Sequence, residues 1–374
     1  MKIRAAVLEQ SGMATPYAES RPLKIQTVDL APPGPGEVLI RIAAAGICHS
    51  DLSVVDGVRP RPLPMVIGHE AAGVVEEVGP YVNDLQKGDH VVTVFVAACG
   101  HCNPCASGRP ALCEPGGVAG SAGGLLGGGH RLSRDGVPLY HHSGVSAFAE
   151  YATVSRHSLV KVDRDIPLEE AALFGCAVLT GVGSAVNAAR VQPGSQVAVI
   201  GLGGVGLAAL LGAVAAGASR IVAIDVNDEK LTLAKVLGAT DVFNAKTPDV
   251  AQAIIEATRG GVDTVLETAG AAAALDLGYT IARRGGELVT AGLPPPSTKF
   301  AIPAVSLVAD EKSIRGSYLG SSVPSRDMPR YLDLYRRGRL PVDRLVTHRL
   351  KLDDINEGMD RLRLGAAVRQ IVTM

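Results

Sequence analysis

A glycine-rich turn between two apolar runs is the feature that most constrains how this chain of 374 residues can fold. Residues 196–200 are a short apolar run of strand character, and residues 201–206 read Gly-Leu-Gly-Gly-Val-Gly. Residues 207–216 are apolar throughout, which favours a buried helix, and residues 219–224 predict a second strand that ends at Asp225. A G-x-G-x-x-G turn between strand and helix, with an acid nineteen positions after its last glycine, is typical of a dinucleotide-binding unit.

Each glycine of this turn has its own structural role. Gly201 permits the tight turn, Gly203 lets the backbone approach a pyrophosphate, and Gly206 lets the helix pack closely on the strand. Gly204 and Val205 open the helix, where free N–H groups and the helix dipole favour phosphate.

The acid that ends the second strand predicts which dinucleotide binds. The carboxylate of Asp225 can accept hydrogen bonds from both ribose hydroxyls and would repel a 2′-phosphate, which selects NAD over NADP. Lys230 follows closely enough to assist at the ribose. The alternative is that Asp225 is only a solvated turn residue.

The remaining pattern of this region predicts an α/β fold. Strand-like runs at 262–266, 287–291 and 313–317 alternate with helix-like segments at 248–259 and 272–283, which favours a doubly wound parallel sheet. The uncharged stretch 197–219 is long enough for a membrane span. Its six glycines and its lack of flanking aromatic and basic anchors favour a strand, a turn and a helix instead.

Composition excludes several classes of function. Thirty-six basic and 37 acidic residues give a net charge of −1, so no global field would collect nucleic acid or an anionic membrane. Hydrophobic residues make up 47 % of the chain, which is ample for a folded core. The apolar stretch near the N-terminus is too short for a signal peptide, so we expect a cytoplasmic protein.

Six cysteines carry the second strong pattern. Four of them, Cys99, Cys102, Cys105 and Cys113, form C-x2-C-x2-C-x7-C, a spacing that suits tetrahedral structural zinc. An iron–sulfur cluster fits less well because the last gap is too long, and a nucleic-acid-binding zinc ribbon lacks basic residues here.

The other two cysteines, Cys48 and Cys176, could bind a catalytic zinc together with His69. The alternative is that each is a small buried apolar residue, and spacing alone does not bring the three together.

These motifs together resemble the zinc-dependent alcohol dehydrogenases of the medium-chain dehydrogenase/reductase superfamily. The resemblance is carried by residues 46–51 (Gly-Ile-Cys-His-Ser-Asp), 68–73 (Gly-His-Glu-Ala-Ala-Gly), 174–176 (Phe-Gly-Cys) and 356–358 (Asn-Glu-Gly), with the cysteine lobe and the glycine turn. It implies a Rossmann-type NAD domain at 178–319 and a GroES-like, mostly β catalytic domain at 1–177 and 320–374.

The resemblance also implies roles for single residues. Cys48, His69 and Cys176 would hold the catalytic zinc, with Glu70 as an occasional fourth ligand and Asp51 fixing the His69 tautomer. The remaining implied roles are a proton path through Ser50, pyrophosphate contacts from His49 and Arg369, and nicotinamide contacts from Thr180 and Val205.

The resemblance leads to three further expectations, about the proton path, the substrate pocket and the oligomeric state. Ser53 stands where many relatives place the histidine that ends the proton path, so we expect a slower or buffer-assisted transfer. Phe95 matches a pocket wall, and Arg59 argues against glutathione adducts or is simply solvated at the pocket mouth. The glycine-rich stretch 114–140 matches a long loop of dimeric relatives, which implies a homodimer joined near 302–318, with a tetramer as the alternative.

The expected activity is therefore NAD-dependent, zinc-dependent oxidation of primary alcohols, aromatic, allylic or medium-chain, or the reverse reduction of aldehydes. Two alternatives stay open. One is a thiol-dependent formaldehyde dehydrogenase, and the other is a relative that binds NAD without turnover.

Overall fold

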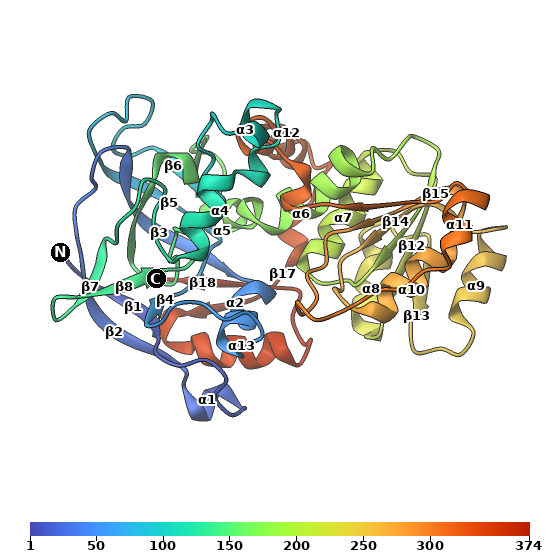
Figure 1. Cartoon of the computed structure of the whole chain (residues 1–374), viewed down its shortest axis with the longest axis horizontal. Coiled ribbons are helices and arrows are strands. Elements are labelled where there is room, and N and C mark those ends of the chain that lie inside the picture. Colours follow the sequence, from blue (N-terminus) through green and yellow to red (C-terminus); the bar gives the residue numbers. More distant parts are fainter. The chain divides into compact units, whose positions relative to one another are not determined.

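The computed structural model describes residues 1–374, and the chain forms two compact units (Figure 1). The first unit comprises Met1–Cys176, Val323–Pro329 and Val346–Met374, and the second comprises Ala177–Ser322 and Arg330–Leu345. The domain limits expected from the sequence stay a prediction. In the structure, residues 330–345 belong to the second unit.

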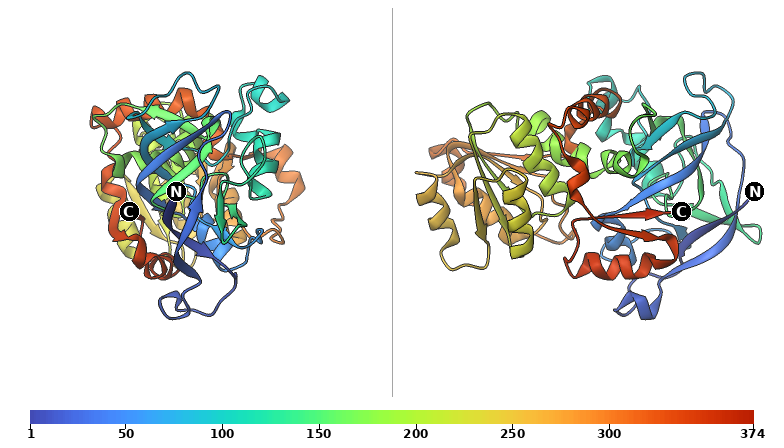
Figure 2. Two further views of the ribbon diagram at one scale, coloured as in Figure 1. Left: turned by 90° about the vertical axis from the view of Figure 1, so that its left-hand side faces the viewer. Right: turned by 180° about the vertical axis from the view of Figure 1, so that it is seen from behind.

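The second unit is built on a six-stranded parallel sheet of order β13-β12-β11-β14-β15-β16. Its strands are β11 (Gln196–Ile200), β12 (Arg220–Asp225), β13 (Asp241–Asn244), β14 (Val262–Glu267), β15 (Ala282–Thr290) and β16 (Ser313–Gly316). Its connecting helices include α7 (Gly204–Ala215), α8 (Asp228–Val236), α9 (Val250–Ala257) and α10 (Ala272–Ile281). Helices cover both faces of this sheet (Figure 2). Counted along the chain the strand order is 3-2-1-4-5-6, which confirms the predicted Rossmann-type topology.

The apolar stretch 197–219 is strand β11, the glycine turn and helix α7. Most of α7 is buried, which explains why the helix is apolar on all sides. Gly217 has φ +83° and follows the helix end, as expected of a glycine in the left-handed region. No single helix in the chain is long and apolar enough to cross a membrane, and one bent pair, Leu168–Gly175 with Ala177–Ala188, qualifies by length and composition only.

The first unit is mostly β, which confirms the GroES-like prediction. A closed barrel joins β1 (Lys2–Leu8), β2 (Leu23–Leu30), β7 (Leu132–Arg134), β8 (Val137–His141) and β4 (Met65–Val66). A second sheet joins β10 (Leu159–Val162), β6 (His90–Thr93), β5 (Ala71–Val78), β3 (Glu37–Ile47), β18 (Arg369–Thr373) and β17 (Val346–Lys351), and β9 (Tyr151–Ser155) also pairs with β3. Strand β18 runs antiparallel to β3, so the C-terminal strand lies beside the segment that ends at Ile47.

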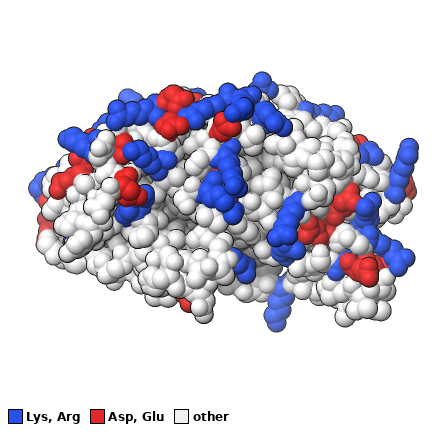
Figure 3. All heavy atoms as spheres, turned by 90° about the horizontal axis from the view of Figure 1, so that it is seen from above, with Lys and Arg blue, Asp and Glu red and all other residues white.

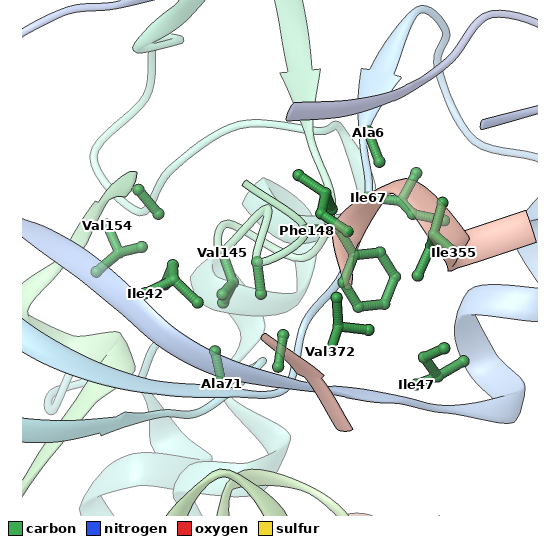
Figure 4. Packing of buried hydrophobic residues seen from close by; sticks show 14 of the residues in the cluster. Ala6, Ile42, Ile47, Ile67, Ala71, Val145, Phe148, Val154, Ile355 and Val372 are labelled. Carbon is green, nitrogen blue, oxygen red and sulfur yellow. The ribbon is translucent and has the colours of Figure 1, made fainter. Parts of the chain in front are cut away.

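One large core holds this unit together. Phe148 is fully buried and packs among Ile67, Val145 and Ile355, which come from distant parts of the chain (Figure 4). Burying an aromatic side chain of this size contributes about 2 kcal/mol relative to leaving it exposed. The core thereby fixes the loop over residues 67–70 on one side and helix α13 (Ile355–Arg363) on the other.

The glycine-rich stretch 114–140 has more regular structure than a long loop. It begins with helix α4 (Glu114–Ser121), because Cys113 caps the helix and Pro115 suits its first turn. It ends in the hairpin of β7 and β8. On the face shown in Figure 3, basic and acidic side chains lie among each other, in keeping with the near-zero net charge.

Candidate functional site

The first unit brings four of the predicted site residues into one buried cluster. Cys48, His69, Glu70 and Cys176 each offer one ligand atom, and these atoms all lie within 4.8 Å of one another. Sequence spacing did not predict this meeting, because the four residues come from three separate segments. The fold brings the predicted ligands of a catalytic zinc close enough to share one ion.

Local folding explains the position of Cys48. The residue is the N-cap of helix α2 (His49–Val55), and its side chain accepts the N–H of Asp51. The Asp51 carboxylate in turn accepts the Cys48 N–H through Oδ2 at 2.9 Å. This reciprocal cap has the form of a capping box in which a thiol replaces the usual hydroxyl.

The same carboxylate orients His69. Nδ1 of His69 lies 2.8 Å from Oδ1 of Asp51, and both side chains are buried. A proton on Nδ1 fits this hydrogen bond, which leaves Nε2 as the free ligand atom. Gly68 has φ +95°, and a Cβ there would lie 2.6 Å from the Phe148 nitrogen, so the turn that presents His69 requires glycine.

Strongly displaced pKa values mark the cluster. A hydrogen bond from the Cys176 thiol holds the pKa of Cys48 well below its usual range, and the pKa of Cys176 rises correspondingly. Burial alone would lower the pKa of His69, but the Asp51 carboxylate raises it well above its ordinary value. The two thiols and the imidazole share protons in this buried site. A bound cation would displace those protons, because metal binds the deprotonated form of each ligand.

Glu70 has an additional partner that the sequence did not predict. Its Oε1 forms an ion pair with Nη2 of Arg369, and both side chains are buried. Burial raises the pKa of Glu70 to about 7, although the positive charge of Arg369 acts to lower it. Arg369 therefore lies beside the cysteine cluster, whereas the resemblance assigns it a pyrophosphate contact, which stays a prediction.

The four-cysteine lobe forms a second metal-binding arrangement. The sulfur atoms of Cys99, Cys102, Cys105 and Cys113 all lie within 4.8 Å of one another. Backbone N–H groups point at two of them: Cys102 N–H donates to the Cys99 sulfur at 3.3 Å, and Cys99 N–H donates to the Cys113 sulfur at 3.2 Å. Such hydrogen bonds stabilise thiolates, which are the form that binds zinc.

Both donor sets fit zinc. Two thiolate sulfurs on one tetrahedral zinc lie about 3.8 Å apart, given Zn–S bonds of about 2.3 Å. The separations of up to 4.8 Å in both clusters need only small side-chain adjustments to reach that geometry. Four cysteines make a closed structural site, whereas two cysteines and a histidine leave a position open for substrate.

The second unit places the dinucleotide fingerprint as predicted. Gly201 has φ +86°, and a Cβ on Gly206 would lie 1.7 Å from the Gly201 oxygen, so the helix can approach the turn only with glycine there. A Cβ on Gly203 would meet nothing within 4 Å, which leaves open space above the start of α7. That open space beside helix N–H groups suits a pyrophosphate.

Asp225 lies at the end of β12 and faces the same turn. Its Oδ2 accepts the Leu202 N–H at 2.6 Å, and its Oδ1 accepts the Asn227 N–H at 3.0 Å. Each oxygen keeps a lone pair for a further donor such as a ribose hydroxyl. Lys230 is half-buried in the first turn of α8 and forms no ion pair with Asp225.

Helix α6 (Ala177–Gly183) carries Thr180 and packs closely on α7. A Cβ on Gly181 would lie 2.3 Å from the Val205 oxygen, so the two backbones approach through that glycine. The predicted nicotinamide contacts Thr180 and Val205 thus belong to adjacent helices of one unit.

The remaining predicted residues surround the cysteine cluster in different ways. The Phe95 ring meets the His69 ring edge-on, with centroids 5.5 Å apart. Ser50 and His49 open helix α2 directly after Cys48, with Ser50 half-buried and His49 exposed.

Arg59 follows that helix, is half-buried, and donates its N–H to the Ser53 carbonyl at 2.8 Å. The proximity of Phe95 to His69 supports a pocket wall. The position of Arg59 neither supports nor excludes a pocket role.

One residue of this neighbourhood is absent from the sequence-based predictions. His142 is buried, and its Nδ1 lies 3.2 Å from Oδ1 of Asp51. Only the adjacent pair His141 and His142 at the end of an apolar strand could have drawn attention to it. Nothing in the spacing links it to Asp51, which is ninety-one positions earlier.

Two family models match separate parts of the chain. The family described as "Alcohol dehydrogenase GroES-like domain" matches residues 34–164, and the family described as "Zinc-binding dehydrogenase" matches residues 204–337.

Several known proteins are similar over the whole length. An S-(hydroxymethyl)glutathione dehydrogenase of Synechocystis sp. is 39 % identical over 376 residues, covering 100 % of both chains. The crystal structure of benzyl alcohol dehydrogenase from Acinetobacter calcoaceticus is 36 % identical with a TM-score of 0.93, covering 100 % of this chain and 99 % of that one. The structure of an alcohol dehydrogenase zinc-binding domain protein from Burkholderia ambifaria is 38 % identical with a TM-score of 0.94 and the same coverage.

Proposed function

Because the chain belongs to the zinc-dependent alcohol dehydrogenase family of the medium-chain dehydrogenase/reductase superfamily, we propose that it interconverts primary alcohols and aldehydes with NAD. It is an enzyme whose cofactors are zinc and a nicotinamide dinucleotide. The observation that carries the proposal is the buried meeting of Cys48, His69 and Cys176, with ligand atoms within 4.8 Å.

Zinc held by Cys48, His69 and Cys176 would supply the Lewis acidity that lowers the pKa of a substrate hydroxyl, and NAD would accept the hydride. Asp51 keeps the His69 ring in the orientation that presents Nε2, through its 2.8 Å hydrogen bond to Nδ1. Ser50, two positions after Cys48 on helix α2, takes the hydroxyl proton.

The four-cysteine lobe would hold the second zinc as a structural ion. Its four ligand positions are all filled by protein sulfur, so no position is left for a substrate. Metal bound there would link the four cysteines of residues 99–113 into one rigid lobe.

NAD is the preferred cofactor because of Asp225. Its carboxylate is held by the N–H groups of Leu202 and Asn227 at the end of β12, so it cannot easily move aside for a 2′-phosphate. Repulsion between two anions at this position disfavours NADP.

The substrate class we propose is aromatic, allylic or medium-chain primary alcohols. The edge-on contact of Phe95 with His69 places an apolar ring beside the metal ligands, and the structurally similar Acinetobacter protein is named a benzyl alcohol dehydrogenase. The second candidate is a thiol-dependent formaldehyde dehydrogenase, which the name of the Synechocystis relative favours. Arg59 weighs against it, since its positive charge would repel the amine of a glutathione adduct.

We also propose a homodimer formed at the free edge of the second unit's sheet. Strand β16 is the outermost strand and its four residues are exposed. Val305 and Val308 on the neighbouring helix α11 (Ala304–Ala309) are 74 % and 81 % exposed, which is unusual for valine on a free surface. V308D should then give monomers by light scattering, whereas an unchanged mass would exclude this edge.

Initial rates of NADH formation test the activity. Ethanol, hexanol, benzyl alcohol, cinnamyl alcohol and formaldehyde with glutathione are each compared with NAD and with NADP. Fast oxidation of benzyl or cinnamyl alcohol with NAD supports the proposal. Activity confined to the formaldehyde–thiol adduct would replace it with the second candidate.

A further inference from the structure

We propose that His142 is a positioning residue of the catalytic metal centre, acting through the Asp51 carboxylate that it shares with His69. The proposal rests on the proposed function only for the identity of the metal. Its evidence lies in the geometry of three buried side chains in the first unit.

His142 and His69 approach the same oxygen atom. Oδ1 of Asp51 lies 2.8 Å from Nδ1 of His69 and 3.2 Å from Nδ1 of His142. The two imidazole rings stand nearly perpendicular, at 80°, with centroids 5.3 Å apart. Movement of either ring therefore changes the space and the hydrogen bonding available to the other.

Burial makes this contact necessary rather than incidental. Asp51 is fully buried, so each carboxylate oxygen must find its donors within the protein. Oδ2 has the Cys48 N–H at 2.9 Å, and Oδ1 has only the two histidines. Without His142, Oδ1 would lose one of its two donors and the carboxylate would be freer to rotate away from His69.

His142 is itself held rigidly. Its N–H donates to the Ser146 hydroxyl at 3.2 Å, and its carbonyl accepts the Val145 N–H at 3.0 Å. Its Nδ1 also lies 3.2 Å from the Gly68 nitrogen. A proton on Nδ1 donates to Asp51, and in that tautomer Nδ1 does not accept the Gly68 N–H. The His142 ring thus lies against the residue before His69, and its Nδ1 faces the carboxylate that orients the His69 ring.

The protein also contains a matched control. His141 is equally buried and hydrogen-bonded, because its Nε2 accepts the Arg131 N–H at 3.0 Å. Its Nδ1 lies 3.4 Å from the Ser146 hydroxyl and its ring stacks on His130, and it forms no hydrogen bond or ion pair with Asp51. Replacing His141 perturbs the same strand end without removing a donor to Asp51.

The test measures metal retention without any substrate. The holoenzyme is mixed with a chromogenic chelator, and loss of the catalytic and structural zinc is followed as two phases. Loss of a residue that supports a metal ligand typically costs about 10–100-fold in metal affinity, so H142F should release the catalytic zinc faster by about that factor. The release of the zinc bound to the four cysteines, and both phases of H141F, should match the wild type.

A pair of polar variants separates the hydrogen bond from simple packing. The amide nitrogen of asparagine can occupy the place of Nδ1, whereas that of glutamine reaches further, toward the place of Nε2. H142N should retain zinc and the visible spectrum of the cobalt-substituted enzyme, and H142Q should lose zinc faster with an altered spectrum. These two variants also decide the question if H142F does not fold.

Equal zinc release from H142N and H142Q would overturn the proposal, as would an effect of H141F as large as that of H142F. If the wild type oxidised none of the alcohols tested, the proposed function would fail. The metal-release comparison would stand unchanged, since it contains no alcohol and no NAD.

Discussion

The carboxylate of Glu70 and the guanidinium of Arg369 form a buried ion pair although the two residues are 299 positions apart in the sequence. Strand β18 makes the pair possible, because it runs beside the strand that ends at Ile47. Gly46 in that strand leaves room for it, since a Cβ there would lie 2.3 Å from Oε1 of Glu70. Oε2 of Glu70 and Nε of Arg369 are buried without a partner, so the pair depends on its one contact.

This dependence predicts the effect of removing one charge. R369M should lower the free energy of unfolding by about 3–5 kcal/mol, because Glu70 would remain as a buried carboxylate without its counter-charge. E70Q combined with R369M should recover a large part of that loss. Urea unfolding of the two variants and the wild type measures the difference, and equal losses in both variants would show that the ion pair is energetically unimportant.

Two glycines of the dinucleotide turn should respond in opposite ways to the same change. G203A adds a methyl group to open space, so the protein should keep its stability and lose affinity for NAD. G206A places a Cβ 1.7 Å from the Gly201 oxygen, so the turn or the helix must shift and the melting temperature should fall by several degrees. Calorimetry with and without NAD separates the two effects, and a destabilised G203A would contradict the first.

The preference for NAD over NADP should depend on Asp225 and not on Asp228, the acid three positions later. D225S should lower kcat/KM for NAD by about tenfold or more and raise it for NADP, because it removes the ribose acceptor and the repulsive charge. Asp228 is exposed and accepts a hydrogen bond from Asn244 at 2.7 Å, so D228S serves as the control. A similar shift in both variants would indicate a general electrostatic effect rather than recognition of the ribose.

The sequence predicted the dinucleotide unit in detail because the whole motif is local. The strand, the turn, the helix and Asp225 lie within thirty consecutive residues, and each glycine has a steric reason that short-range geometry determines. The four-cysteine lobe was predictable for the same reason. Stretch 114–140 was interpreted less well, since its glycines concealed the capped helix α4.

Contacts between distant segments explain what sequence reasoning missed. Cys48, His69 and Cys176 could be grouped only through the family resemblance, because their meeting depends on the fold of the whole first unit. The pairing of Glu70 with Arg369 and the approach of His142 to Asp51 have no spacing signal at all. The first arises from the pairing of β18 with β3, which joins the two ends of the chain, and the second from core packing of the segments that hold Leu52 and Val145.

The proton path should be limited by Ser53. Its hydroxyl donates to the His49 carbonyl at 3.0 Å and the residue is buried, so it is poorly placed to exchange protons with solvent. Alcohol oxidation by the wild type should therefore accelerate with buffer concentration, and S53H should reduce that dependence. S53A is the control for loss of the hydroxyl alone. If S53H leaves both the rate and the pH profile unchanged, protons leave by another route.

Buried His141 should make the protein less stable in mild acid. Burial, with the nearby positive charges of His130 and Arg131, lowers the pKa of His141 to about 3, whereas in the unfolded chain a histidine titrates near ~6.5. Below that unfolded value the unfolded state binds a proton that the folded state does not, so stability falls as the pH drops from about 6.5 to about 3. Each pH unit in this window costs at most about 1.4 kcal/mol.

The variant H141N removes this titration, so its free energy of unfolding should fall less than that of the wild type between pH 7 and pH 4. The expected difference is at most about 3 kcal/mol, obtained from urea unfolding at each pH. H157N, which replaces an exposed histidine, controls for the loss of any imidazole. Acid-driven loss of zinc affects all three proteins alike and cancels in the comparison. Parallel curves for H141N and the wild type would show that His141 becomes protonated in the folded state at a higher pH than its burial implies.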